Sequence, residues 1–354
     1  MHSMKQQVRR VVGGVDSHAD THQAAALDER GRLLGSKSFA VSAAGYRELL
    51  AWLASFGLIE RVGVESTGSY AAGLTRHLLA EGVRVLEVNQ PHAHTRRRKT
   101  DAIDAELAAR HALSRASAVT PKQTSGIVES IRQLRVARNS AVKSRSAAIV
   151  QLGELARTAP SELREQLAIR STVKGKAALC RRLRPDTDRL GEPANGAKLA
   201  LRSLAGRIAR LDDEIAQLDG QLAPLVATAA PRTTALLGIS TGHAGQLLIT
   251  AGQNIDRLHS EAAFAALCGA SPIPIASGKR GRYRLNPGGD RQANRALHMI
   301  AVCRLRHCAK TRAYAHRRSS EGKTKKEIIR CLKRYIARQT YATLRDDLRS
   351  LTIG

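Results

Sequence analysis

The chain has 354 residues, with 58 Lys and Arg against 30 Asp and Glu, a net charge of +28 and a pI near 11. Its 43% hydrophobic and 25% charged residues are enough to form hydrophobic cores, which excludes a disordered basic tail. A charge excess of this size repels itself unless a polyanion neutralises it, so nucleic acid is the expected partner. Aromatic residues make up only 3% of the chain, which argues against base stacking as the main mode of binding.

The N-terminal third, residues 1–115, alternates short apolar runs with amphipathic stretches. Its first three runs are separated by turn residues such as those at 28–31, which predicts strands joined by tight connections. The resulting order βββαβαβα is that of the ribonuclease H-like fold, an α/β domain with a mixed sheet covered by helices. The predicted elements are strands at Val11–Asp16, Gln23–Leu27, Leu33–Val41, Arg61–Glu65 and Val83–Val88, and helices at Ala43–Phe56, Ala71–Glu81 and Thr100–Leu113.

The middle third, residues 116–230, is predicted to be a helical linker and oligomerisation region. Its leucines and isoleucines alternate spacings of three and four over three heptads, the pattern of a coiled coil. A looser apolar stripe from Ile131 to Leu152 precedes it. The heptads can therefore pair with this upstream helix in the same chain or with a second copy of the chain. The heptad positions are Leu201, Leu204, Ile208, Leu211, Ile215, Leu218 and Leu222.

The C-terminal third, residues 231–354, is the most basic part and is predicted to be mainly helical. It carries 23 basic and 7 acidic residues, whereas residues 1–115 carry 16 and 12. Leu236–Ser240 matches either a helix-hairpin-helix turn or a plain turn between helices. Gly269–Gly289 is rich in Pro, Gly and Ser and is predicted to be a flexible loop. Helices are predicted at Arg291–Arg306 and Lys325–Tyr341.

Four carboxylates form the first candidate site. Asp16 ends the first predicted strand and Glu65 ends the fourth, so both are expected at one edge of the sheet. Asp101 and Asp104 are three residues apart, which places them on one face of the third helix. Clustered carboxylate oxygens bind Mg²⁺ or Mn²⁺, and two such ions stabilise the attacking and leaving oxygens of a phosphoryl displacement. His18 is either an auxiliary ligand or a solvent-facing residue after the strand.

Ser277 is the second candidate. It lies in the predicted loop, directly before several cations, and attack on a DNA phosphate needs a hydroxyl close to groups that neutralise the phosphate oxygens. Composition alone does not distinguish it from an ordinary turn serine. The residues expected to contact nucleic acid are Arg96, Arg97, Arg98 and Lys99 beside the acids, Lys279, Arg280, Arg282 and Arg284 after the serine, and Arg291, Asn294 and Arg295 on the following helix.

Several motifs together resemble those of one family. They are Val15-Asp16-Ser17-His18, Val64-Glu65-Ser66-Thr67-Gly68, Lys99-Thr100-Asp101-Ala102-Ile103-Asp104-Ala105, Leu267-Cys268-Gly269-Ala270-Ser271-Pro272, Ser277-Gly278, and Gly288-Gly289-Asp290-Arg291-Gln292-Ala293-Asn294-Arg295-Ala296-Leu297. The combination resembles the DEDD transposases of the "IS one-ten" insertion-sequence family, recombinases associated with a guiding bridge RNA. The resemblance covers nearly the whole chain.

The resemblance implies a RuvC-like domain, a coiled-coil linker and a C-terminal transposase domain. It assigns Mg²⁺ to Asp16, Glu65, Asp101 and Asp104, and a covalent 5′-phosphoserine link to Ser277. It further implies donor and target DNA, a guide RNA and a homo-oligomer from dimer to tetramer, and it favours the intermolecular pairing of the heptads. Two alternatives stay open: a RuvC-like junction nuclease that uses water as nucleophile, and an architectural nucleic-acid-binding protein without catalysis.

The expected compartment is the bacterial cytoplasm, in association with the nucleoid. The five cysteines include no Cys-x-x-Cys pair, which is typical of free thiols in a reducing compartment. The N-terminus lacks the apolar segment of a signal peptide, and no apolar run reaches the ~18 residues of a membrane span. No membrane partner is therefore expected.

Overall fold

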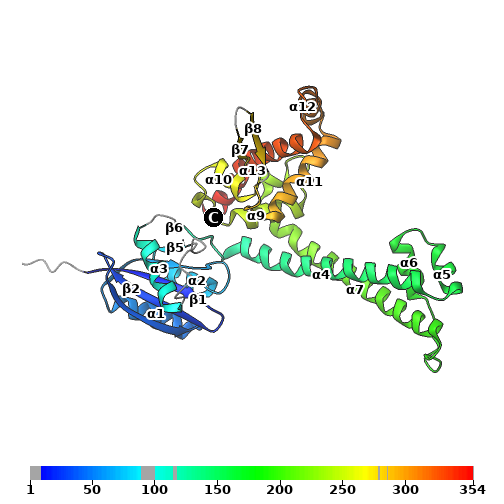
Figure 1. The fold of residues 1–354 in the computed structure, drawn as a ribbon, viewed down its shortest axis with the longest axis horizontal. Helices are drawn as coiled ribbons and strands as arrows, with labels where there is room; N and C mark the ends of the chain where they lie inside the picture. Colours follow the sequence, from blue (N-terminus) through cyan, green and yellow to red (C-terminus); the bar gives the residue numbers. More distant parts are fainter. Residues whose placement is uncertain (1–8, 89–99, 115–117, 278–279, 285, 354) are drawn as a thin grey trace, which may run out of the picture. The chain divides into compact units, whose positions relative to one another are not determined.

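The computed structural model describes residues 9–88, 100–114, 118–277, 280–284 and 286–353 (Figure 1). The chain divides into two compact units, Met1–Val128 with Leu247–Gly354, and Glu129–Gln246. The first unit joins two stretches of sequence, because the segment after the sheet is hydrogen-bonded to the C-terminal part. There the Lys122 ammonium group donates to the Ile249 carbonyl at 3.1 Å, and the Gln123 amide donates to the Asn254 side chain at 2.9 Å. The predicted boundaries at residues 115 and 230 stay a prediction.

A six-stranded mixed sheet forms the N-terminal part, with strand order β3-β2-β1-β4-β5-β6. The first three strands are antiparallel, β4 and β5 run parallel to β1, and β6 is antiparallel to β5. The central position of β1 explains why its residues are almost all buried. The strands are β1 (Arg10–Ser17), β2 (Thr21–Asp28), β3 (Leu33–Ala40), β4 (Leu58–Val64), β5 (Val85–Val88) and β6 (Ala118–Val119).

Helices cover both faces of this sheet, because side chains alternate along β1. Val11 and Val15 pack in one core with leucines of α1 (Ala43–Ala54) and α2 (Ala72–Ala80). Val12 faces the other way, towards α3 (Asp101–Ser114). This arrangement is the RNase H-like fold that the sequence predicts. Only the two-residue strand β6 was not predicted, since nothing in so short a segment distinguishes a strand from a loop.

Glycine allows α3 to lie unusually close to the sheet. A Cβ atom on Gly14 of β1 would lie 2.1 Å from the Ala109 amide nitrogen and 2.2 Å from the Ala105 carbonyl oxygen. Such distances leave no room for a side chain, so the helix backbone packs directly on the strand backbone. This contact fixes the helix whose first turn carries Asp101 and Asp104.

Two long helices, α4 (Gly126–Thr158) and α7 (Pro193–Ala229), dominate the second unit. They run antiparallel, and the guanidinium group of Arg138 donates to both Asp219 carboxylate oxygens at 2.6 and 2.9 Å. Arg145 pairs with Asp212 two turns further on. The structure therefore shows pairing within one chain, the alternative that the family resemblance disfavoured (Figure 1). The short helices α5 (Ser161–Ala168) and α6 (Val173–Arg181) pack against α4 and α7 in one shared hydrophobic core.

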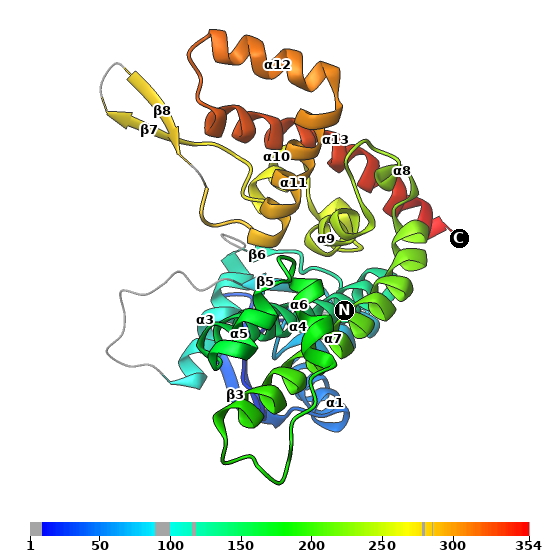
Figure 2. The same cartoon turned by 90° about the vertical axis from the view of Figure 1, so that its right-hand side faces the viewer.

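The C-terminal part is mainly helical, as predicted, with one exception. The predicted flexible loop at Gly269–Gly289 contains an antiparallel hairpin, β7 (Ile273–Ser277) and β8 (Arg280–Arg284), which Figure 2 shows extending from the helices. The three prolines in this segment hid the strand pattern, although Pro274 lies within β7, because proline is tolerated in a strand that has a free edge. The helices are α9 (Thr241–Ala251), η1 (Ile255–Arg257), α10 (Glu261–Leu267), α11 (Arg291–His307), α12 (Ala309–Ser320) and α13 (Lys325–Ile353).

The turn at Leu236–Ser240 joins the four-residue helix α8 (Pro231–Thr234) to α9. The hydroxyl of Ser240 accepts a hydrogen bond from the His243 amide at 3.3 Å, which caps α9. Serine thus takes the capping role at the position where the helix-hairpin-helix pattern has its second glycine. Among the described residues no helix is both long and apolar enough to cross a membrane.

Candidate active site and nucleic-acid interface

Asp16 and Glu65 lie side by side at the carboxyl ends of two parallel strands. Asp16 is near the end of β1, and Glu65 directly follows β4, whose Val64 is the register partner of Val15. The Glu65 amide donates to the Val15 carbonyl at 3.1 Å, and the Ser17 hydroxyl donates to the Glu65 carbonyl at 3.1 Å. The sheet ladder therefore extends far enough to fix the backbone of both acids.

The first turn of α3 brings two more acids to the same place. Asp104 is 6% exposed and Asp101 is exposed. The imidazole Nε2 atom of His18 lies 3.1 Å from Asp16 Oδ2 and 3.5 Å from Asp101 Oδ1. Ligand atoms of Asp16, His18 and Asp101 all lie within 4.8 Å of one another. His18 is thus not simply solvent-facing, and it belongs to the acidic cluster.

The electrostatics of Asp16 reflect this crowding. Burial raises the pKa of Asp16, and the negative charges of Asp104 and Asp101 raise it further, against the opposing effect of His18. Like charges held together this closely are costly unless a cation neutralises them. The oxygen-rich set with one imidazole fits a hard divalent ion. The residues present therefore match the donor chemistry of a divalent metal site.

The predicted serine lies at the end of β7, where its backbone pairs in register with Arg280 of β8. The structure describes the backbone but not the side chains of Ser277, Arg280 and Arg282. Arg284 is exposed at the end of β8. Five of the predicted contact residues lie outside the described residues: Arg96, Arg97, Arg98, Lys99 and Lys279.

Asn294 differs from its neighbours on α11. Arg291 and Arg295 are exposed, as a role in contacting nucleic acid requires. The Asn294 side-chain amide instead donates to the carbonyls of Cys268 and Gly269, at 3.0 and 2.8 Å, and its oxygen accepts from Lys333 at 2.8 Å. Asn294 therefore holds the segment that leads into the hairpin.

Two family models match the chain over separate regions. A model of the DEDD transposases of IS110 type matches residues 13–159, and a model described as "Transposase IS116/IS110/IS902 family" matches residues 232–316. The chain belongs to the IS110 family of DEDD transposases. It is therefore an enzyme that cuts and rejoins DNA, which excludes the architectural alternative. The first match includes the acidic cluster, and the family suggests divalent-metal binding, for which Asp16, His18 and Asp101 form a possible site. No curated protein matches the chain.

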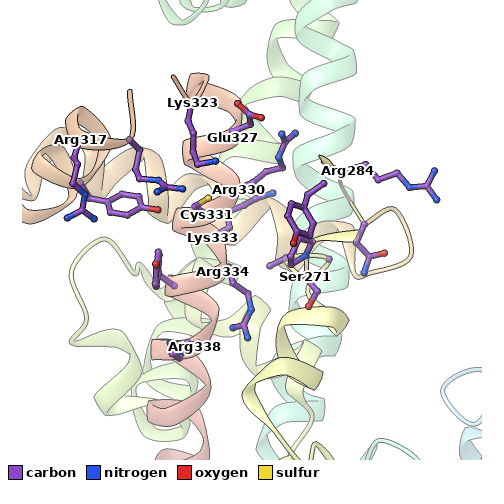
Figure 3. Close-up of a pocket in the computed structure, with 18 residues that line it drawn as sticks. Ser271, Arg284, Arg317, Lys323, Glu327, Arg330, Cys331, Lys333, Arg334 and Arg338 are labelled. Carbon is purple, nitrogen blue, oxygen red and sulfur yellow. The ribbon is translucent and has the colours of Figure 1, made fainter. Parts of the chain in front are cut away.

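The transposase also has a large cavity that its sequence did not reveal. A space of about 930 Å³ lies between the hairpin, α12 and α13 (Figure 3). Its lining combines seven Arg and Lys side chains besides Arg284 with three tyrosines, one cysteine and one glutamate. Sequence reasoning identified this third of the chain as its most basic part but assigned no role to the cations of α13. It missed the cavity because helix α12, which encloses one side, shows almost no apolar periodicity and has no buried residue.

Proposed function

We propose that this transposase cuts and rejoins DNA through a covalent phosphoserine link on Ser277, with Mg²⁺ held by Asp16, Glu65, Asp101 and Asp104. The metal part is supported by the cluster of Asp16, His18 and Asp101 with Asp104 close to Asp16, and by the position of Glu65 directly after β4, the strand beside β1. His18 contacts two of these acids and serves as an auxiliary ligand. When bound, the metal supplies charge neutralisation at the phosphate and lowers the pKa of a coordinated hydroxyl.

The serine step conserves the energy of the bond that it breaks. The Ser277 oxygen forms a bond to phosphorus and loses its proton, while the bond to the DNA 3′-oxygen breaks and that oxygen gains a proton. A 3′-hydroxyl of another strand then attacks the 5′-phosphoserine, releases the serine and restores a phosphodiester. The number of phosphoester bonds is unchanged, so no nucleotide cofactor is consumed. Arg280, which pairs with Ser277 across the hairpin, is suited to neutralise the phosphate.

Two partners belong to the same proposal. A bridge RNA is proposed to specify donor and target by base pairing, which leaves the protein to contact duplex shape and backbone. A homo-oligomer from dimer to tetramer is proposed because Leu211, Ile215 and Leu218 of α7 are only half-buried in one chain. Half-buried heptad positions leave an apolar stripe for a second copy. Co-purifying RNA can be sequenced, and the mass in solution can be measured by light scattering.

The serine is tested by trapping the covalent link. The purified transposase is incubated with Mg²⁺ and labelled DNA that spans the ends of its insertion element, and a denaturing gel separates protein–DNA adducts. We expect an adduct with the wild type and with Ser271→Ala, and none with Ser277→Ala. Ser271 is a matched control because it lies in the same segment before β7.

The junction-nuclease alternative gives a different pattern. Water as the nucleophile would leave cut DNA with free ends and no adduct in any variant, including the wild type. Recombination at the normal rate by Ser277→Ala would overturn the serine mechanism.

A further inference from the structure

Three parts of the chain line the cavity beside the hairpin: helix α12, helix α13, and the segment that leads into the hairpin together with β8. In Figure 3 the side chains of α13 stand between Arg317 of α12 on one side and Ser271 of the hairpin segment on the other. The labelled Arg284 side chain extends away from them. The ligand of this cavity must therefore be recognised mainly by α12, α13 and the exposed Tyr283 of β8.

Not all of the cavity's cations are neutralised within the protein. Arg334 and Arg338 share the carboxylate of Glu261, and Arg317 and Arg318 share that of Glu321. These four cations are thus largely satisfied by two acids. In the part of the chain that the structure describes, the one acid in the lining itself is Glu327, whose carboxylate accepts from the backbone and hydroxyl of Thr324 and is attracted by Lys323 and Arg330.

Arg330 and Lys333 have no such partner. Within the described residues neither forms an ion pair with a carboxylate, and the Lys333 ammonium group donates only to Asn294, at 2.8 Å. Lys333 is just 5% exposed. Burial lowers its pKa, and the positive charge of Arg330 lowers it further. Among the described residues, Arg330 keeps only the longer-range attraction of Glu327, and Lys333 is buried with no carboxylate in contact, so this adjacent pair of cations forms a site that an anion stabilises.

Aromatic rings are concentrated in the same cavity. The whole chain has ten aromatic residues, and Tyr283, Tyr314 and Tyr335 all line this space. The rings of Tyr314 and Tyr335 pack edge to face with their centroids 5.6 Å apart. Tyr335 is nevertheless 56% exposed, and Tyr283 is 63% exposed. Burial and the neighbouring Cys331 raise the pKa of Tyr314 to about 12, so its hydroxyl stays neutral. Large exposed rings gathered in one cavity mark an interaction site, and here they lie in the same lining as Arg330 and Lys333.

We propose that this cavity binds an unpaired segment of nucleic acid, with its phosphates at Arg330 and Lys333 and its bases against Tyr335 and Tyr283. A free phosphate would use the cations but leave the rings without a role. A duplex keeps its base faces stacked inside the helix, where tyrosines cannot reach them. A single strand offers both groups at once, and base–aromatic stacking combined with a basic groove is how single strands are bound.

The test measures binding and does not require strand cleavage. The full-length transposase, freed of nucleic acid, is titrated against a labelled single-stranded DNA oligonucleotide that cannot fold, an RNA of the same sequence and the corresponding DNA duplex. We expect Tyr335→Ala to weaken binding of single strands by about fivefold or more, while binding of the duplex changes less than twofold. Tyr335→Phe keeps the ring and is expected to retain wild-type affinity.

Matched controls separate this site from general charge and folding effects. Tyr70 is 59% exposed and lies in the N-terminal part, so Tyr70→Ala removes an equally exposed ring elsewhere. Arg330→Gln is expected to flatten the plot of log affinity against log salt by about 0.7, the value for one phosphate contact on a single strand. Lys326→Gln, one turn earlier on the same helix and exposed, removes the same charge outside the lining.

The outcomes distinguish DNA from RNA as the bound single strand, and they can overturn the proposal. A loss on DNA alone identifies the unpaired strand of the DNA substrate as the ligand, and a loss on RNA alone identifies an RNA partner. If Tyr335→Ala affects binding no more than Tyr70→Ala does, or weakens duplex and single strand equally, the proposal is wrong. It rests on the transposase acting on nucleic acid, but not on Ser277. A chain that forms no serine adduct can therefore still pass this test.

Discussion

Asp16 and Ser277 both stand at the end of a β-strand, but the two strands have very different support. The β1 strand is paired on both sides, is buried along almost its whole length and is covered by helices on both faces. The β7 strand pairs with β8 alone, in a sheet of only two strands. A two-stranded ribbon has little stability of its own. The comparison indicates a pre-organised acidic site and a serine on an element that can adjust to its substrate.

The largest expected effect follows from removing one charge at the rigid site. Asp16→Asn is expected to lower the rate of DNA cleavage by about 10³-fold, since it removes a proposed metal ligand that would contribute several kcal/mol at the transition state. The free energy of unfolding should not fall, because the buried carboxylate lies beside other acids. Cleavage assays and chemical denaturation measure the two effects. Asp20→Asn, an exposed acid on the following turn, is the control and should keep both values.

The close packing of α3 on β1 predicts the second effect. Gly14→Ala places a methyl group 2.1 Å from the helix backbone, so the helix must move. We expect a loss of about 3 kcal/mol in the free energy of unfolding, with lower metal affinity because Asp101 and Asp104 move too. Urea denaturation and calorimetry with Mn²⁺ measure these changes. Gly68→Ala, which has open space, should change little, and an equal loss there would refute the packing argument.

A smaller loss of stability is expected at a similar glycine contact, between Gly289 and Gly269 at the base of the hairpin. A Cβ atom on Gly289 would lie 2.2 Å from the Gly269 amide nitrogen, where two loop segments approach each other. Loops move apart more easily than a helix and a sheet, so Gly289→Ala should cost about 1–2 kcal/mol. The adjacent Gly288→Ala has only one contact, at 3.4 Å, and serves as the control. If Gly289→Ala costs as much as Gly14→Ala, the hairpin region is as rigid as the sheet.

Much of the acidic site could be predicted from the sequence because each acid follows a strong local signal. Asp16 and Glu65 come after apolar runs too short for helices, and parallel strands bring their carboxyl ends to one edge. The spacing of Asp101 and Asp104 fixes their common face. His18 could not be assigned this way. Its contact with Asp101 joins residues far apart in the sequence, and such a contact has no local signature.

The C-terminal part was harder to predict for the same reason. The β7–β8 hairpin contains a proline, two glycines and several arginines in a pattern typical of loops, and only pairing between the two strands makes it a hairpin. The heptads of α7 predicted a helix and its apolar face, but periodicity does not identify the partner helix. The ion pairs of Arg138 and Arg145 with acids of α7 show that the partner lies in the same chain.

The sequence by itself determined the fold class and the charge gradient along the chain, and it predicted the four acids, because period and spacing express these features locally. The family follows from motifs that are likewise contiguous. The tertiary structure alone decided that His18 joins the acids, that Asn294 holds the segment before the hairpin, and that three tyrosines line one cavity with Arg330 and Lys333. These features depend on contacts between distant segments, whose geometry is set by packing and not by any local preference.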